Sequence, residues 1–190
     1  MDILGLLKLI LAFFKHESSA PITPVPPAGP YEPPWYTLAK HEVGFKERLG
    51  NRDIQRYTGP AKCGQEGDPW CAVFVNAMLE GVGIRGTYSA MARSFEHSAA
   101  FKRLDRPALG CIVTMWRDSP DSGRGHVFFY AGENDNGIVA LGGNQKNSVC
   151  FQYEPKNRVF GYYWPAALPS PNLGPIYVAA LAALTAGSEE

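Results

Sequence analysis

The chain has 190 residues, 45% of them hydrophobic, and its 18 basic and 18 acidic side chains give a formal net charge of zero. This length suits one domain with extensions, whose core needs no disulfide support. The balanced charge, without a long Lys/Arg run, excludes the footprint of a nucleic-acid-binding protein. Four cysteines without a Cys-x-x-Cys pair are too few for a disulfide scaffold and leave the redox compartment open.

Residues 1–20 form a separate apolar segment, because residues 3–14 are apolar on almost every side of a helix. Such a helix would be about 18 Å long, short of the roughly 30 Å hydrocarbon core of a bilayer. Three interpretations remain: an export signal or uncleaved anchor, a docking helix for a membrane, virion or partner protein, and a helix folded back on the domain.

Residues 21–34 contain seven prolines and predict an extended polyproline spacer. A proline-rich strap lying on the domain surface fits the same composition. The globular domain is expected to span residues 35–168, and residues 169–190 are expected to form a C-terminal extension with a short Ala-rich helix.

Within the domain, helical patterns precede strand patterns. Residues 35–43 and 89–101 are expected to be helices, the second capped by Thr87 or Ser89, and an irregular stretch with Gly59-Pro60 leads to a buried helix at Cys71. Five short strands are expected at residues 111–116, 126–131, 138–141, 149–153 and 159–164. This order predicts an α+β domain with helices packed on a roughly five-stranded antiparallel sheet.

Cys71 lies in the first turn of its predicted helix, after Asp68 as N-cap and Pro69 at the first helical position. The helix ends at Gly81 and Gly83. Free N–H groups and the positive helix end favour a thiolate at this position, which would activate Cys71 as a nucleophile. The alternative is a small buried thiol on an apolar helix face.

His126 begins a predicted strand, and the turn at residues 134–137 should fold that strand back as a hairpin. Reflection of the chain about Asp135 places His126 opposite Asn144, where an amide oxygen can accept from the imidazole. A slip of one residue would offer Gly143 or Gln145 instead.

A helix-start cysteine, a later strand histidine and a neighbouring amide match the papain-like arrangement. From about Trp35 to Pro165 the chain resembles the CHAP and NlpC-type cysteine peptidases of bacteria and phages. The resemblance is carried by Asp-Pro-Trp-Cys at 68–71, Gly-His-Val at 125–127 and Leu-Gly-Gly-Asn-Gln at 141–145. It implies a papain-like fold and no cofactor, with Cys71 as nucleophile, His126 as base and Asn144 as orienting residue. Many CHAP domains have glutamate where this chain has Gly142, so its orienting group would be neutral.

The remaining candidates are weaker. The backbone N–H of Cys71 is expected to bind the oxyanion, and Gln65 has the spacing of the papain oxyanion glutamine. Trp70, Tyr88 and Trp116 could line a substrate groove or serve as core aromatics. Cys63, Cys111 and Cys150 are most simply structural thiols. A zinc site formed by Cys63, Cys71 and His126 lacks recognisable ligand spacing, so no metal is predicted.

The resemblance implies a peptidoglycan hydrolase that cuts stem-peptide or crossbridge amides through a cysteine nucleophile. An N-acetylmuramoyl-L-alanine amidase is the chemical alternative, and a catalytically silent wall-binding or virion module is the alternative from another class. The expected place of action is the periplasm or cell envelope, or the host wall at lysis, with association to a virion as a further option.

Overall fold

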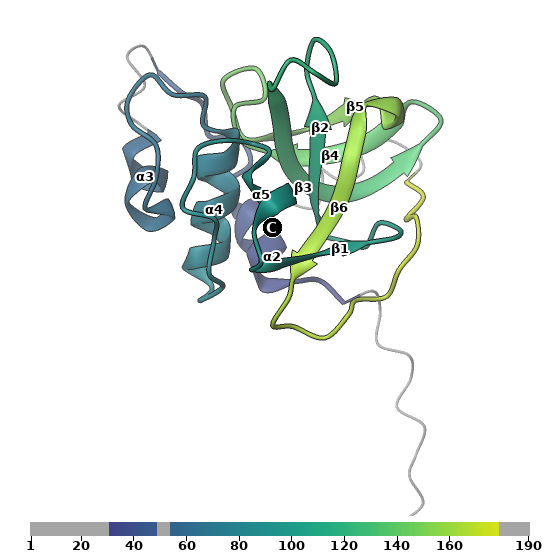
Figure 1. The fold of residues 1–190 in the computed structure, drawn as a ribbon. Helices are drawn as coiled ribbons and strands as arrows, with labels where there is room; N and C mark the ends of the chain where they lie inside the picture. Colours follow the sequence, from purple (N-terminus) through teal and green to yellow (C-terminus); the bar gives the residue numbers. More distant parts are fainter. Residues whose placement is uncertain (1–30, 49–53, 179–190) are drawn as a thin grey trace, which may run out of the picture.

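The computed structural model describes residues 31–48 and 54–178, which form an α+β domain with four α-helices beside a six-stranded antiparallel sheet (Figure 1). The helices are α2 (Pro34–His41), α3 (Gln55–Ala61), α4 (Cys71–Gly81) and α5 (Ser94–His97). The strands are β1 (Phe101–Leu104), β2 (Ile112–Trp116), β3 (Gly125–Asn134), β4 (Gly137–Gly142), β5 (Cys150–Glu154) and β6 (Val159–Pro165). No helix in this described part of the chain has the length and apolar character needed to cross a membrane.

The strand order in the sheet is β1-β6-β2-β3-β4-β5. The last strand, β6, lies between β1 and β2, so the C-terminal part of the domain supplies an inner strand of the sheet. β2, β3, β4 and β5 follow one another as successive antiparallel neighbours. Strand β3 is therefore central, with β2 on one side and β4 on the other.

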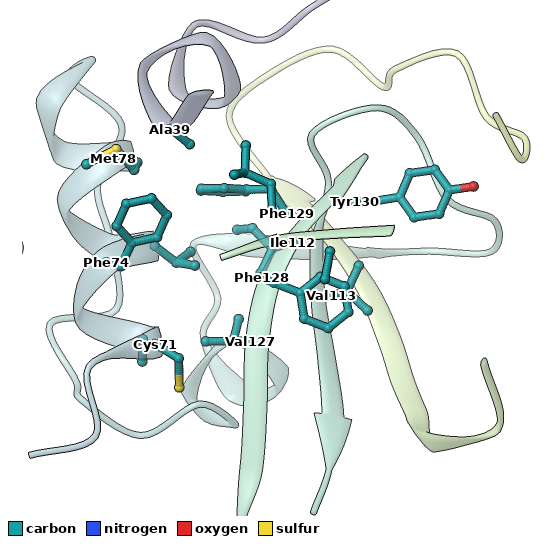
Figure 2. Close-up of a cluster of buried hydrophobic side chains, with 14 of the residues drawn as sticks. Ala39, Cys71, Phe74, Met78, Ile112, Val113, Val127, Phe128, Phe129 and Tyr130 are labelled. Carbon is teal, nitrogen blue, oxygen red and sulfur yellow. The ribbon is translucent and has the colours of Figure 1, made fainter. Parts of the chain in front are cut away.

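Helix α4 joins the helical layer to the sheet. Every residue from Cys71 to Leu79 is buried, because α4 packs between α3 on its outer side and β3 on its inner side (Figures 1 and 2). Phe74 points from α4 towards Phe129 of β3, with ring centroids 6.4 Å apart. A helix with apolar residues on all sides is stable only when buried in this way. The packing fixes the N-terminal end of α4 against the start of β3.

The five strands predicted from the sequence are confirmed to within three residues at each end. The helix predicted over residues 89–101 is wrong: only α5, four residues long, forms there, and Phe101 begins β1. Phe101 instead pairs with Pro165 and packs its ring on Phe95 at 5.2 Å. Helix α3 replaces an expected irregular stretch. In both places tertiary contacts override a weak local preference.

The domain begins slightly before the predicted boundary at Trp35. Glu32 accepts hydrogen bonds from Thr37 and Lys40, at 2.6 Å and 2.9 Å, and Pro33 is the N-cap of α2. At the other end, residues 169–178 are irregular apart from a bridge at Tyr177, where Glu133 of β3 exchanges backbone hydrogen bonds with Ile176 and Val178. The predictions for residues 1–30, and for an Ala-rich helix within residues 179–190, lie outside the described residues.

Candidate active site

Helix α4 begins at Cys71, and its N-cap is Trp70. The predicted cap at Asp68 is wrong, because its Oδ2 accepts the backbone N–H of Gln65 at 3.0 Å in the preceding turn. The carbonyl of Trp70 accepts the first helical hydrogen bond, from Phe74 N–H at 2.9 Å. Cys71 is therefore the first helical residue, where backbone N–H groups have no partner within the helix.

The thiol of Cys71 lies near Val127 at the start of β3 (Figure 2). Burial raises the pKa of Cys71, and this outweighs the backbone N–H groups of Val127, Ala72 and Cys71 itself, which lower it. Only 6% of the residue is exposed. The expectation of a helix-start thiolate is corrected accordingly: desolvation dominates, and the resting group is a protonated thiol.

His126 is completely buried at the start of β3, and its Nε2 lies 3.1 Å from Oε1 of Gln145. The amide nitrogen of Gln145 donates to the carbonyls of Cys150 and Ala140, at 2.5 Å and 3.4 Å. Because that nitrogen faces two acceptors, Oε1 must accept from the histidine, and Nε2 holds the imidazole proton. The tautomer is fixed, and Nδ1 carries a bare lone pair.

His126 Nδ1 is buried without any hydrogen-bond partner. Most buried polar atoms are paired, so an unpaired one calls for an explanation, and a catalytic role is one of the few available. Burial, together with the positive charge of Arg117, lowers the pKa of His126 to about 4. The resting site therefore holds a neutral imidazole one residue away from the N–H group that the Cys71 thiol approaches.

The prediction that Asn144 orients His126 is corrected, because Gln145 occupies that position. The ladder pairs Phe129 with Leu141, the register that would place His126 opposite Asn144 if β4 continued. However, β4 ends at Gly142, which pairs with Cys150.

The chain beyond β4 contains one extra residue. Gln145 and Ser148 exchange backbone hydrogen bonds around a two-residue turn whose residues, Lys146 and Asn147, both have positive φ. Residues 143 and 144 thus lie opposite the single residue 149, and Asn144 adopts a left-handed conformation with φ 57°. This bulge moves Gln145 onto the face of the sheet that carries His126.

The two glycines before Asn144 make this arrangement possible. A Cβ on Gly142 would lie 3.0 Å from Gln145 Oε1, and a Cβ on Gly143 would lie 2.5 Å from the Trp70 ring and 2.6 Å from Phe74. Real Cβ atoms do not make the second pair of contacts without displacing their neighbours. Gly143 therefore permits α4 to approach the sheet, and Gly142 leaves room for the amide that orients His126.

Cys71 opens onto a surface cavity of about 380 Å³. The cavity wall comes from the approach to α4, the loop before α5, and the loops that flank β3 and β4; it consists of Asp68, Pro69, Cys71, Ala90, Met91, Ala92, Arg93, Arg117, Gly123, Arg124, Gly125 and Asn144. His126 is not a wall residue; it follows Gly125 in the chain and is completely buried. Asn144, although not the partner of His126, is a wall residue that substrate could contact.

The segment of the cavity wall at Ala90 and Met91 is held in place by hydrogen bonds from a buried residue of α4. Asn76, fully buried on α4, donates to Ser89 O at 3.0 Å and to Thr87 Oγ1 at 3.2 Å, and it accepts the Thr87 N–H at 2.7 Å. These bonds fix the chain just before Ala90 and Met91. Sequence reasoning missed Asn76, although an isolated amide on an otherwise apolar helix face is the signal that would have identified it.

The remaining predicted site residues do not meet at this cavity. Gln65 is exposed in a turn, and Trp70 is core, stacked on Tyr57 and donating to Glu47 at 2.6 Å. Tyr88, 39% exposed, lines a different cavity with Arg85. Trp116 is half-buried beneath Arg158, 5.0 Å from its ring centroid. Sequence analysis did not identify the three arginines of the cavity wall. Two of them, Arg117 and Arg124, lie shortly before the Gly-His-Val sequence at residues 125–127.

Within the described ranges, no group of three or more His, Cys, Asp or Glu side chains could hold a metal ion. The four cysteines are all free thiols. Cys111 is fully buried and Cys150 lies against Gln145, at 3.8 Å from its amide nitrogen. Comparisons with protein-family models, curated proteins and solved structures found no match to this chain.

Proposed function

We propose that this protein is a papain-like cysteine hydrolase that cleaves an amide bond in the stem peptide or crossbridge of peptidoglycan. The observation that supports the chemical part is the buried, unpartnered Nδ1 of His126, whose tautomer is fixed by Gln145. The substrate class comes from the resemblance of residues 68–71, 125–127 and 141–145 to CHAP and NlpC-type enzymes. A proton acceptor near a helix-start thiol is what such a hydrolase requires.

The reaction begins from a neutral pair. His126 Nδ1 takes the Cys71 proton as Sγ attacks the carbonyl carbon of the scissile amide, and the carbonyl electron pair moves to oxygen. The backbone N–H of Cys71 can donate to this oxyanion. The imidazolium then gives its proton to the leaving amine as the C–N bond breaks, which leaves a thioester. Water, deprotonated by the same nitrogen, attacks the thioester and returns the thiol.

Nδ1 and the thiol form no hydrogen bond in the free protein, since Nδ1 has no partner. Catalytic hydrogen bonds are often long before substrate binds and shorten in the complex. The proposed reaction therefore requires substrate binding to bring Nδ1 and the Cys71 thiol within hydrogen-bonding distance. Gln145 takes the part that the resemblance gave to Asn144, and it remains a neutral amide that holds the ring without charging it.

Two other functions remain as alternatives. An N-acetylmuramoyl-L-alanine amidase would use the same residues on a different amide of the same polymer. A catalytically silent wall-binding or virion module would need neither the thiol nor the imidazole. The proposed place of action is the cell envelope or the host wall at lysis, and peptidoglycan is the proposed partner.

The test incubates the purified full chain with isolated sacculi and identifies the released fragments by mass spectrometry. The new amino and carboxyl ends of the fragments identify the bond that was cleaved. They therefore distinguish endopeptidase activity from amidase activity. Cys71→Ala should release nothing, whereas Cys63→Ala, a half-buried thiol away from the cavity, should release the same fragments as wild type. Release by folded Cys71→Ala would refute the nucleophile, and sacculus binding without release by wild type would favour the binding module.

A further inference from the structure

The cavity beside Cys71 has a cationic rim. Three of its wall residues are arginines, Arg93, Arg117 and Arg124, and Asp68 is its one acidic wall residue. Arg117 and Arg124 face each other where the β2–β3 hairpin loop begins and ends, because Arg117 N–H donates to Arg124 O at 3.0 Å. Guanidinium groups gathered at a reaction cavity are suited to an anionic ligand.

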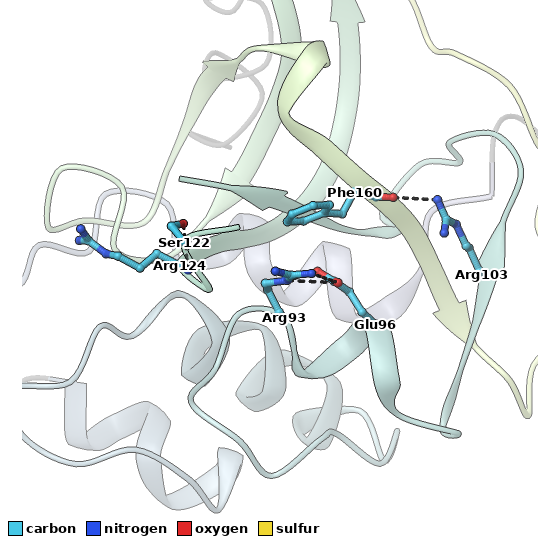
Figure 3. Close-up of polar contacts among 6 residues, drawn as sticks. All are labelled: Arg93, Glu96, Arg103, Ser122, Arg124 and Phe160. Atoms are coloured by element: carbon cyan, nitrogen blue, oxygen red, sulfur yellow. Dashed lines mark hydrogen bonds and ion pairs between the residues drawn. The ribbon is translucent and has the colours of Figure 1, made fainter. Parts of the chain in front are cut away.

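Two of these arginines already have anionic partners. Arg93 forms a bidentate pair with Glu96 at 3.0–3.2 Å, and its guanidinium lies 4.1 Å from the centroid of the Phe160 ring (Figure 3). Arg124 pairs with Asp118 at 2.8 Å. The contacts with Glu96 and Phe160 hold Arg93 in place, whereas the Arg124–Asp118 pair is exposed to solvent and holds Arg124 only weakly.

Arg117 differs from both. Its side chain is exposed, and it makes no ion pair with any residue in the described ranges. The backbone beneath it is nevertheless fixed, since Ser122 Oγ donates to Arg117 O at 2.7 Å and accepts the Arg124 N–H at 3.2 Å (Figure 3 shows Ser122 and Arg124). The positive charge of Arg117 lowers the pKa of both Cys71 and His126. Its charge therefore acts on Cys71 and His126, and also on the carboxyl group of Glu154, with which it forms no ion pair.

We propose that Arg117 binds a carboxylate of the substrate, so that the enzyme selects peptides carrying a free carboxylate close to the scissile amide. This inference rests on the proposed function, and it names the substrate chemistry of that site. A planar guanidinium matches a carboxylate with two parallel hydrogen bonds, which fixes position as well as charge. Arg117 would bind stem peptides whose carboxylates are free. It would not bind in the same way to stem peptides whose carboxylates are amidated.

The experiment compares native sacculi with sacculi whose carboxylates have been converted to carboxamides with carbodiimide and ammonium chloride. Wild type should release fragments from native material about tenfold faster, the size of one charge-assisted hydrogen bond at an exposed group. Arg117→Gln should lower this ratio to about one, and Arg117→Lys should keep part of it. Arg106→Gln removes an exposed arginine outside the cavity wall and should keep the wild-type ratio.

Equal release from both substrates by wild type, or an undiminished ratio in Arg117→Gln, would overturn the proposal. A parallel binding assay uses the full-length Cys71→Ala chain on the same two materials. If wild type hydrolyses neither material but Cys71→Ala prefers native sacculi through Arg117, the hydrolase function fails and the carboxylate site stands. If that binding shows no preference, the carboxylate site fails as well.

Discussion

Gln145 Oε1 and His126 Nε2 lie 3.1 Å apart, and this contact decides which ring nitrogen carries the proton. The Gln145 amide cannot exchange the positions of its oxygen and nitrogen, because the nitrogen donates to the carbonyls of Cys150 and Ala140. The hairpin formed by β4 and β5 thus sets the tautomer of His126, a residue on β3. Removal of Gln145 should affect catalysis well beyond its effect on stability.

Gln145→Ala should reduce the rate of sacculus hydrolysis by about a hundredfold, because the imidazole would lose both its fixed tautomer and its orientation. Asn144→Gly is the matched control at the neighbouring residue. Glycine keeps the left-handed backbone, so the rate of hydrolysis should fall only a few-fold. Steady-state release rates, measured below each variant's melting temperature, make the comparison. The reverse order of effects would restore Asn144 as the orienting residue.

Acid should unfold the protein partly through His126. Burial lowers its folded pKa to about 4 from an ordinary 6.5, so between these values the unfolded chain binds a proton that the folded chain does not. This contribution to stability is complete above pH 6.5, falls as the pH drops towards 4, and amounts to ~3 kcal/mol.

Urea unfolding of wild type and His126→Gln at pH 7, 5.5 and 4.5 measures that contribution as the difference between their pH slopes. Carboxylates titrate alike in both proteins and cancel in the comparison. Parallel slopes for wild type and His126→Gln would show that His126 is not buried as a neutral ring.

The thiol of Cys71 should be unreactive in the free protein. Burial raises its pKa, and each unit of increase removes about tenfold of its thiolate near neutral pH. Alkylation by iodoacetamide at pH 7, followed by peptide mass spectrometry, should therefore be at least about tenfold slower at Cys71 in the native protein than in urea. Rapid native alkylation already at pH 6 would instead indicate a stable thiolate.

Gly142→Ala and Gly143→Ala should separate function from stability. The Cβ that Gly142→Ala adds would lie 2.9 Å from Phe128 Cβ and 3.0 Å from Gln145 Oε1, so the orienting amide must move and β3 must shift slightly. Activity should therefore fall, and stability should fall less than in Gly143→Ala. The Cβ that Gly143→Ala adds would meet the Trp70 ring and Phe74 within 2.6 Å, next to the start of α4. Overpacking there should destabilise the protein by about 1–3 kcal/mol. Thermal melts alongside hydrolysis rates distinguish the two effects, and equal losses of stability would contradict this division.

The sequence by itself determined the elements whose patterns are strong over many residues. The run from Cys71 to Leu79, apolar except for Asn76, predicted a buried helix, and the Asn-Asp-Asn-Gly turn at residues 134–137 folded β3 onto β4 as predicted. Together with the other strand patterns these features predicted an α+β domain, and the motifs that resemble CHAP and NlpC-type peptidases selected Cys71 and His126 as candidates.

The tertiary structure decided what depends on single residues and on burial. A one-residue bulge at Asn144 placed Gln145 beside His126, and no periodicity in the sequence marks where a ladder ends. The helix end should have favoured a thiolate at Cys71, but the opposing cost of desolvation depends on what packs over the sulfur. The arginine cavity arises because two hairpin ends and the loop before α5 meet beside α4, a contact between segments that lie far apart in the chain.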